Sequence, residues 1–351
     1  MKPIFQLAGR MLLMLLTASH SWCGLSEEVA PAPATNNIFG RMQENQTQVF
    51  VASDVPETVE QAVKETLAVA VETWGSSGRL EYWVLGTDRD AAVELSKRYC
   101  ERRVVRGDMT QKACEADRSN KDHGFLMYQK IGADAMESGT PRGSAGHNGG
   151  AQWGFHNMTS SLPLGFAGKL EIAGEGEQVT LLHEYWHSIQ NGFIQSTDHK
   201  RRRELMGPVW FVEGSAVAMA ETTAATLWAS GKLPRWNNSP RGWPSLEQRM
   251  ANKMRHIQAK RGECESLLPD SYESECRQLA YDGGAWALAY LMNHSGQDVL
   301  LKSFHPHVET LGWEGAFKKA FGRSSAEFIT EFETFLDLPL SEQLQILPSA
   351  D

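Results

Sequence analysis

The sequence of 351 residues has no surplus of basic residues. Its 34 Lys and Arg residues are outnumbered by 43 Asp and Glu residues, which gives a formal net charge of -9. Proteins that bind nucleic acids usually carry a basic surface, so the composition argues against a nucleic-acid partner. The sequence also lacks internal repeats and low-complexity tracts, which excludes repeat architectures and favours an ordinary globular core.

No apolar run approaches the roughly 20 residues that a transmembrane helix needs. The short run Met11–Leu16 follows Lys2 and Arg10 and precedes the small residues of 17–19. This order of charged, apolar and small residues is typical of a secretory signal peptide. We therefore expect a signal peptide over residues 1–23, no stable membrane span, and a mature protein that is secreted or periplasmic.

Cysteine is scarce, and no two cysteines have C-x-x-C spacing, which argues against a zinc-finger type of site. Apart from Cys23 beside the signal peptide, four cysteines remain, and four allow three pairings. Pairing of neighbours, Cys100 with Cys114 and Cys264 with Cys276, is favoured because each closes a short loop, stabilising the fold by roughly 3 kcal/mol. Free buried thiols are the alternative. Disulfides would agree with export.

Apolar periodicity divides the chain into parts. Residues 24–48 are expected to form a flexible lead-in, 49–174 an N-terminal α/β part, and 175–351 a helical part that ends in a closing helix. The pattern predicts helices over 59–73, from Asp88 or Asp90 to 103, from 179 onward, and over 210–228, 283–292 and 324–336; strands over 80–85 and 125–130; and a long glycine-rich loop over 139–154.

His183 and His187 lie four residues apart in a segment with helical periodicity. Both imidazoles then project from one face of a helix and can bind a single Zn²⁺ ion. Glu184 follows the first histidine and points toward the water on the metal, where it acts as general base. The H-E-x-x-H pattern also arises by chance on surface helices, so a further ligand is needed to support the interpretation.

A catalytic zinc site uses three protein ligands and keeps one position open. The pattern H-E-x-x-H-x-x-G-x-x-H is excluded, because its later positions hold Gln190 and Phe193. Glu213 in the apolar segment PVWFVEGSA is the favoured third ligand, since a carboxylate in apolar surroundings is costly unless it is paired or metal-bound. Glu204 and Glu221 are the alternatives. Glu204 lies in a charged stretch, where exposure to solvent accounts for a carboxylate without a metal. Glu221 lies two helical turns beyond Glu213, from where it can support a metal ligand.

The motifs HEYWH and WFVEGSA together resemble the gluzincin metallopeptidases, the thermolysin-like and aminopeptidase-like clan, in which a W-x-x-E-G-x-A segment supplies the third ligand. The segment YDGGAW over 281–286 and the tail AFGRSSAEFITEFETFL are similar to the minimal secreted peptidase MA-like branch. The resemblance covers residues 175–337. It implies an α+β fold with a small mixed sheet, an edge strand over Leu170–Ala173 before the zinc helix, and a largely helical C-terminal half. An extended peptide can pair with such an edge.

The implied activity is zinc-dependent hydrolysis of peptide bonds in a peptide or protein substrate, with one catalytic zinc ion. Glu184 would take a proton from water and deliver it to the leaving amine. The resemblance makes Tyr281 the candidate donor to the oxyanion; a buried core tyrosine is the alternative. His147 and His156 fall within or beside the glycine-rich loop, where they either line the cleft or are ordinary loop histidines.

The sequence departs from the thermolysin-like pattern in one respect. Those enzymes carry an acidic residue four positions after the glutamate ligand, where this chain has Val217, so another group such as Asp282 must orient the first histidine. No G-x-M-E-N motif is present, so removal of single N-terminal residues is not expected. The departure motivates an alternative, a non-catalytic zinc-binding module that recognises a partner or a cell-envelope component. Glu184 weighs against it, because such a module needs no general base.

Overall fold

The computed structural model describes residues 46–121, 123–236 and 242–348. The predicted signal peptide, residues 1–23, lies outside the described residues, as does most of the predicted lead-in over 24–48. The last three residues of that lead-in belong to the first strand, β1 (Gln46–Val51), so the folded part begins earlier than predicted, with a strand that the sequence analysis did not predict.

The first part of the fold contains both strands and helices. After β1 come α1 (Glu57–Trp74), β2 (Arg79–Val84), α2 (Arg89–Arg106), α3 (Gln111–Arg118), α4 (Phe125–Ser138), β3 (Ala145–Gly150) and β4 (Phe155–Ser160). The described residues after β4 contain only helices: α5 (Gly174–Gly192), α6 (His199–Met206), α7 (Val209–Ala229), α8 (Leu246–Lys260), α9 (Gln278–Ser295), the π-helix η1 (Leu300–Phe304), α10 (His305–Phe321), α11 (Ser325–Leu336), α12 (Leu340–Gln343) and the 3-10 helix η2 (Leu344–Ile346).

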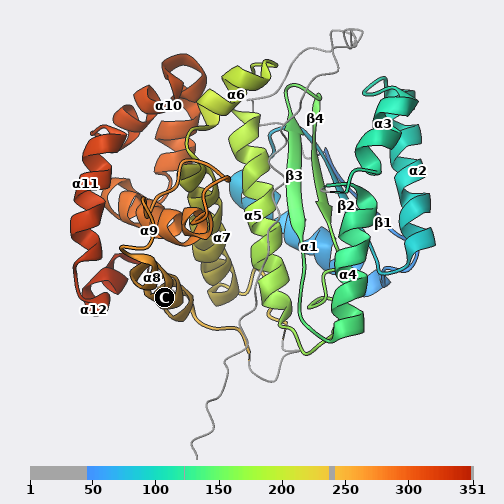
Figure 1. The fold of residues 1–351 in the computed structure, drawn as a ribbon, viewed down its shortest axis with the longest axis horizontal. Coiled ribbons are helices and arrows are strands. Elements are labelled where there is room, and N and C mark those ends of the chain that lie inside the picture. The colour runs from blue at the N-terminus through green and yellow to red at the C-terminus, as the bar shows by residue number, and fades with distance from the viewer. Residues whose placement is uncertain (1–45, 122, 237–241, 349–351) are drawn as a thin grey trace, which may run out of the picture.

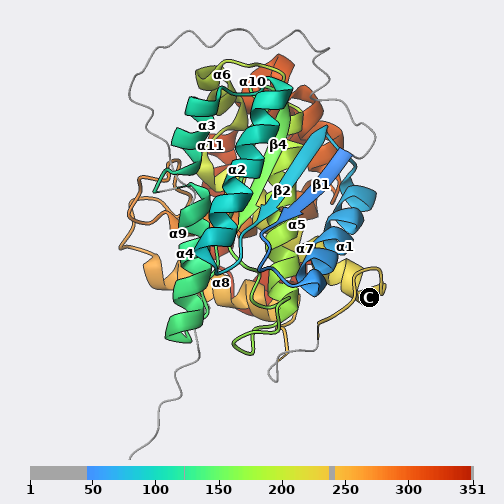
Figure 2. The ribbon, with the colours of Figure 1, turned by 90° about the vertical axis from the view of Figure 1, so that its right-hand side faces the viewer.

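The four strands form one mixed sheet in the order β1-β2-β4-β3. β1, β2 and β4 are parallel, and β3 runs antiparallel to β4 at one edge. Helices cover both faces, α1 and α5 on one side and α2 and α4 on the other (Figures 1 and 2). Because both faces are covered, β2 is buried along almost its whole length. The arrangement places the β3 edge beside α5.

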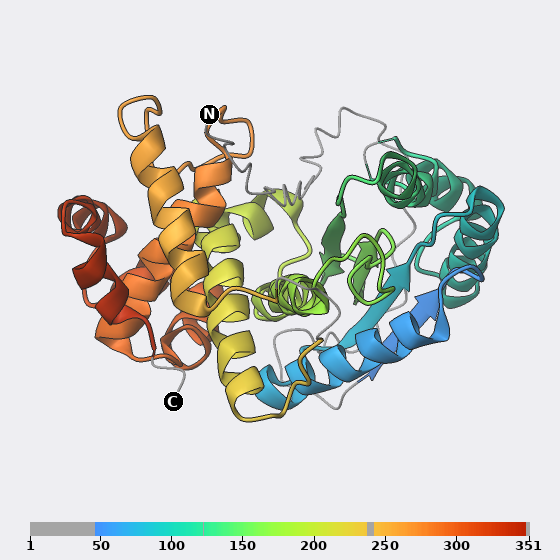
Figure 3. The same ribbon diagram turned by 90° about the horizontal axis from the view of Figure 1, so that it is seen from below.

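The second half is a helical layer built around α7, which packs against α5 on one side and α9 on the other. Figure 3 shows α7 and α9 crossing, with the sheet on the far side of α5. The crossing depends on two glycines: a Cβ added to Gly214 would lie 2.3 Å from the carbonyl carbon of Gly284, and one added to Gly284 would lie 2.2 Å from the oxygen of Trp210. The fold is thus α+β with a small mixed sheet and a helical C-terminal half, as predicted.

The helices predicted from periodicity are confirmed. The six observed helices that correspond to them are α1, α2, α5, α7, α9 and α11, and the strand predicted over 80–85 is β2. Asp88 rather than Asp90 caps α2, because its side chain accepts a hydrogen bond from the N–H of Ala91 at 2.7 Å.

Three local predictions are wrong. Residues 125–130 begin helix α4, not a strand; buried residues recur at helical spacing through Ala135. Residues 170–173 form no strand, because Leu170 and Glu171 adopt the left-handed conformation with φ of 55° and 51°, which a strand excludes. The predicted loop over 139–154 contains the strand β3, whose glycine-rich sequence has little strand propensity and is extended through its pairing with β4.

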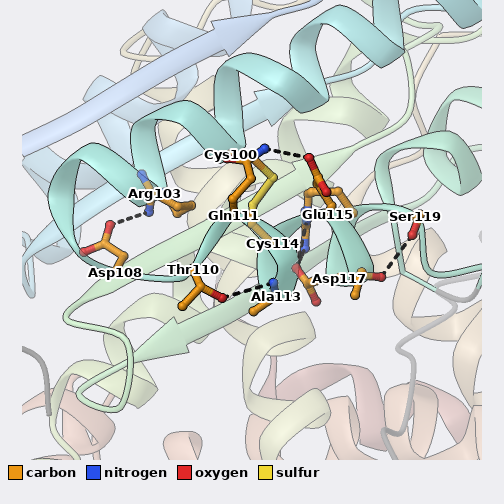
Figure 4. The surroundings of a disulfide bond; sticks show 12 residues. Cys100, Arg103, Asp108, Thr110, Gln111, Ala113, Cys114, Glu115, Asp117 and Ser119 are labelled. Carbon is orange, nitrogen blue, oxygen red and sulfur yellow. Dashed lines mark hydrogen bonds and ion pairs between the residues drawn. A yellow bond between two sulfur atoms is a disulfide. The ribbon is translucent and has the colours of Figure 1, made fainter. Parts of the chain in front are cut away.

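Two disulfides join the neighbouring cysteines, Cys100 with Cys114 and Cys264 with Cys276, and confirm the predicted pairing. The first fastens α2 to α3 (Figure 4).

In α3, burial alone would raise the pKa of Asp117, but a hydrogen bond from His123 and the charge of Arg118 outweigh burial and lower that pKa to about 2. In the described part of the chain, no helix combines the length and apolarity that crossing a bilayer requires.

Candidate metal centre

Helix α5 carries both predicted histidine ligands on one face. His183 and His187 are one helical turn apart, and their rings lie edge to face with centroids 4.8 Å apart. The whole turn from His183 to His187 is buried, because α5 runs between the sheet and α7. Burial of two imidazoles is costly unless their nitrogens have partners. We therefore expect polar or charged groups, or a metal ion, next to both histidines.

Helix α7 supplies the third predicted ligand. Glu213 lies in the second turn of α7 and is almost completely buried. The adjacent Gly214 lets α7 approach α9 closely. Helix α7 also packs on α5, so the Glu213 carboxylate faces the two histidines. Two histidines of α5 and one glutamate of α7 are thereby brought to one point inside the protein.

The three ligand atoms form a nearly regular triangle. The Nε2 atoms of His183 and His187 are 3.1 Å apart, and Oε2 of Glu213 lies 3.3 Å and 3.4 Å from them. The centre of such a triangle is ~1.9 Å from each corner, close to the roughly 2.0–2.1 Å that zinc–nitrogen and zinc–oxygen bonds require. The three atoms therefore already have the spacing of a metal site, and the group can hold a metal ion.

The electrostatics of the cluster favour a cation at its centre. Burial alone would lower the pKa of His187, but the Glu213 carboxylate outweighs burial and raises that pKa to about 9. Burial alone would raise the pKa of Glu213, but the two imidazoles outweigh it and lower that pKa. A carboxylate and two imidazoles thus attract positive charge to one place, which a divalent ion supplies more fully than a proton.

Two carboxylates at the centre have oxygens that the fold does not satisfy. Among the described residues, neither oxygen of Glu184 has a hydrogen-bond partner, and Oε2 of Glu213 has none either, although all three atoms are buried. Burial raises the pKa of Glu184. Buried polar atoms without partners are rare in folded proteins, so the chain's own residues fit a metal ion and a water molecule or substrate at this point.

Gln190 orients His187. Its amide oxygen accepts a hydrogen bond from Nδ1 of His187 at 2.7 Å, which leaves Nε2 free to bind a metal. Its amide nitrogen donates to the oxygen of Val212 at 2.9 Å and to Oγ of Ser215 at 2.7 Å. Gln190 therefore joins α5 to the turn of α7 that carries the third ligand, a role that the sequence analysis did not assign to it.

Asp282, predicted to orient a ligating histidine, has other partners. Its carboxylate contacts Nδ1 of His256 at 2.6 Å and Nζ of Lys253 at 3.5 Å. Glu221, the alternative to Glu213, pairs with Arg249 in the same network and is not part of the metal cluster. Glu204 lies on the exposed face of α6 and is likewise not part of that cluster.

Two tyrosines lie at the centre, one predicted and one not. The ring of Tyr281, from α9, stacks on that of His183 with centroids 6.2 Å apart. Tyr272, from the segment between α8 and α9, donates a hydrogen bond from its hydroxyl to Oε1 of Glu213. No sequence pattern points to Tyr272, because 59 residues separate it from its partner.

The two histidines assigned to the glycine-rich loop lie in the sheet. His147 in β3 has its ring 6.3 Å from that of His187, and its Nε2 is 3.0 Å from Nδ1 of His156 in β4. Burial lowers the pKa of both histidines, that of His156 to about 3. His147 therefore stands as a neutral side chain in the edge strand beside the metal cluster, and neither it nor His156 is the ordinary loop histidine of the alternative.

A separate cavity lies at the other end of α5. Its volume of about 30 Å³ has room for one or two water molecules. Glu177 lines it, and burial raises the pKa of that carboxyl to about 7 even though the backbone N–H of Gly165 donates to it at 3.1 Å. None of the three metal-cluster residues lines this cavity, so it is distinct from the metal centre.

Comparison of the chain with models of known protein families, with curated proteins and with solved structures finds no match. The case for function therefore depends on the geometry of the centre itself.

Proposed function

We propose that this chain is an exported zinc-dependent metallopeptidase, and that His183, His187 and Glu213 hold its catalytic ion. The observation that carries the proposal is Glu184, a buried carboxylate beside the cluster whose two oxygens have no hydrogen-bond partner among the described residues. A module that only binds metal gains nothing from such a costly group, whereas a hydrolase needs a base at this position.

A zinc ion in this cluster would acidify a water molecule and polarise the scissile carbonyl group. Glu184 is the base that takes the proton of that water, and its raised pKa suits it to hold the proton and pass it to the leaving amine. Gln190, by accepting the hydrogen bond from Nδ1 of His187, leaves Nε2 of that histidine available to hold the ion. Tyr281, stacked on His183, is the proposed donor to the oxyanion.

The edge strand β3 offers a place for an extended peptide. It is the last strand of the sheet and packs beside α5. Three of its residues are the glycines Gly146, Gly149 and Gly150, and glycine within a strand often marks a place where another backbone approaches closely. A peptide that adds to this edge would pass His147, whose ring lies next to that of His187. We assign β3 the substrate-binding role that the sequence analysis gave to residues 170–173.

Export is supported by the two disulfides, which form and persist in oxidising compartments. The proposal for a signal peptide over residues 1–23 is tested by determining the N-terminus of the protein recovered outside the cytoplasm.

Digestion of a broad peptide library tests the catalytic proposal. We expect cleavage by the zinc-loaded protein, its loss on chelation, and its return when zinc is added back. Glu184→Gln should retain zinc and cleave about 10²- to 10⁴-fold more slowly. Glu175→Gln, which changes another buried carboxylate of α5 at a distance from the cluster, is the control and should cleave normally.

Two results would decide against the proposal. Full activity in a zinc-loaded Glu184→Gln protein would refute the assigned base. The absence of any chelator-sensitive cleavage across the library, in a protein that binds zinc, would favour the non-catalytic zinc-binding module.

A further inference from the structure

The segment between α8 and α9 reaches the metal cluster through one side chain. This segment, coloured orange in Figure 1, carries Tyr272 and is closed on itself by the disulfide between Cys264 and Cys276. The Tyr272 hydroxyl donates to Oε1 of Glu213. A loop closed by a disulfide therefore contacts Glu213, the predicted metal ligand on α7.

The hydrogen bond distinguishes the two oxygens of Glu213. Oε1 is occupied by Tyr272, while Oε2 faces both imidazoles and has no hydrogen-bond partner in the described chain. A carboxylate held in this way offers one oxygen to a metal. If both oxygens turned to the metal, they would crowd the position that a catalytic site keeps open for water or substrate.

We propose that Tyr272 is a positioning residue that holds Glu213 as a one-oxygen ligand, and that the Cys264–Cys276 disulfide loop holds Tyr272 in place. The proposal rests on metal binding by the cluster, which is part of the proposed function. It assigns a role at the centre to a tyrosine and a disulfide that lie outside both metal motifs.

The loop is fixed where it approaches the site. The carbonyl oxygens of Pro269 and Asp270 accept hydrogen bonds at 3.1 Å and 3.2 Å from the backbone N–H groups of Trp210 and Val209, respectively. These N–H groups belong to the first turn of α7, where a helix has no internal partners for them. The loop thus caps the helix that carries Glu213, within three residues of Tyr272.

The loop also contacts α9. The side chain of Leu268 is buried, and the oxygen of Leu267 lies so close to Gly283 that a Cβ there would be 2.4 Å from it. These contacts fix the middle of the loop, and the Cys264–Cys276 disulfide joins its two ends. Tyr272 lies between the fixed middle and the second cysteine, so the disulfide limits how far it can move from Glu213.

Metal binding by Tyr272→Phe tests the tyrosine. Zinc affinity is measured on the metal-free full chain by competition with a chromophoric chelator, and the coordination number is read from the visible absorption of the Co²⁺ form. We expect zinc to bind about tenfold more weakly or worse, and the Co²⁺ absorption to weaken because a released Glu213 binds through both oxygens. Tyr290→Phe is the matched control. The Tyr290 hydroxyl donates a hydrogen bond of 2.6 Å to Glu331, and neither residue belongs to the metal cluster. This variant should behave as wild type.

Selective reduction tests the loop. The Cys264–Cys276 disulfide is half-buried and Cys100–Cys114 is buried, so a mild reductant followed by alkylation opens the first in the folded protein. We expect opening to weaken zinc binding as Tyr272→Phe does, and to cause no further loss in the Tyr272→Phe protein, because the loop acts through that tyrosine. Cys264→Ser with Cys276→Ser should give the same result, and Cys100→Ser with Cys114→Ser should leave zinc affinity unchanged.

The outcomes separate this inference from the proposed function. Wild-type zinc affinity and Co²⁺ absorption in Tyr272→Phe would overturn the inference alone. Unchanged zinc affinity after the loop is opened, or an equal further loss in the Tyr272→Phe background, would overturn the role of the disulfide. Failure of the wild-type protein to bind either metal would overturn the proposed function together with this inference.

Discussion

Replacement of Gln190 by Met removes the contact that orients His187 while almost preserving side-chain volume. The amide of Gln190 makes three hydrogen bonds: it accepts from Nδ1 of His187 and donates to the oxygen of Val212 and to Oγ of Ser215. Met can replace none of them. The substitution therefore leaves a buried imidazole N–H without a partner and breaks the link between α5 and α7.

The size of the effect follows from these contacts. An unpaired buried donor costs about 1–3 kcal/mol, so we expect the metal-free Gln190→Met protein to be less stable than wild type by about that amount. Loss of the partner also frees His187 to rotate or to change tautomer, and such losses weaken metal binding about 10- to 100-fold. Stability and zinc affinity should therefore fall together.

Gln178→Met is the matched control. Gln178 is buried in the same helix, accepts a hydrogen bond from Nε1 of Trp228 at 2.9 Å and donates to the oxygen of Pro234 at 2.9 Å, but it has no contact with the metal ligands. Urea unfolding of the metal-free proteins should show similar losses for both variants, whereas chelator competition should show weaker zinc binding for Gln190→Met only. Equal zinc affinity in the two variants would refute the assigned role of Gln190.

Three further outcomes test the fold that holds the site. The pKa of Asp117 is about 2 in the folded protein and near 3.9 in an unfolded chain, so the carboxylate stabilises the fold above about pH 4 and this stabilisation is lost as the pH falls through about 2. Asp117→Asn should therefore be about 2 kcal/mol less stable at pH 7, and a deficit in urea unfolding that persists undiminished at pH 2 would argue against the ion pair. Gly214→Ala would place a Cβ 2.3 Å from Gly284 and should cost about 1–3 kcal/mol in thermal unfolding by forcing α7 from α9; an unchanged melting temperature would contradict the close crossing. Removal of the Cys100–Cys114 disulfide should lower the free energy of unfolding by about 3 kcal/mol without loss of zinc, and loss of zinc would show that this disulfide also supports the centre.

The sequence alone predicted the parts of the site that depend on helical spacing. His183 and His187 share a face because they are four residues apart, and Glu213 was identified because a charge within an apolar helix needs a partner; the structure brings all three together. Gln190 could have been found in the same way, since it lies three residues after His187 on the same helix.

The remaining features depend on tertiary contacts that local patterns do not encode. The apolar run at 125–130 fits a short strand as well as a helix, and only the continued burial through Ala135 favours α4. The strand β3 has a sequence rich in glycine and exists because β4 pairs with it. Tyr272 meets Glu213 only through the folding of a disulfide-closed loop onto α7, so neither its identity nor its position in the sequence indicates its role.

The zinc content of the protein tests the central claim most directly. Wild type, Glu213→Gln and Glu221→Gln are purified, loaded with zinc, dialysed against a weak chelator and assayed for bound metal. Both substitutions replace a buried carboxylate of α7, but only Glu213 belongs to the cluster. We predict one zinc ion per chain in wild type and in Glu221→Gln, and loss of stoichiometric zinc in Glu213→Gln. Absence of zinc from wild type, or full retention by Glu213→Gln, would contradict the account.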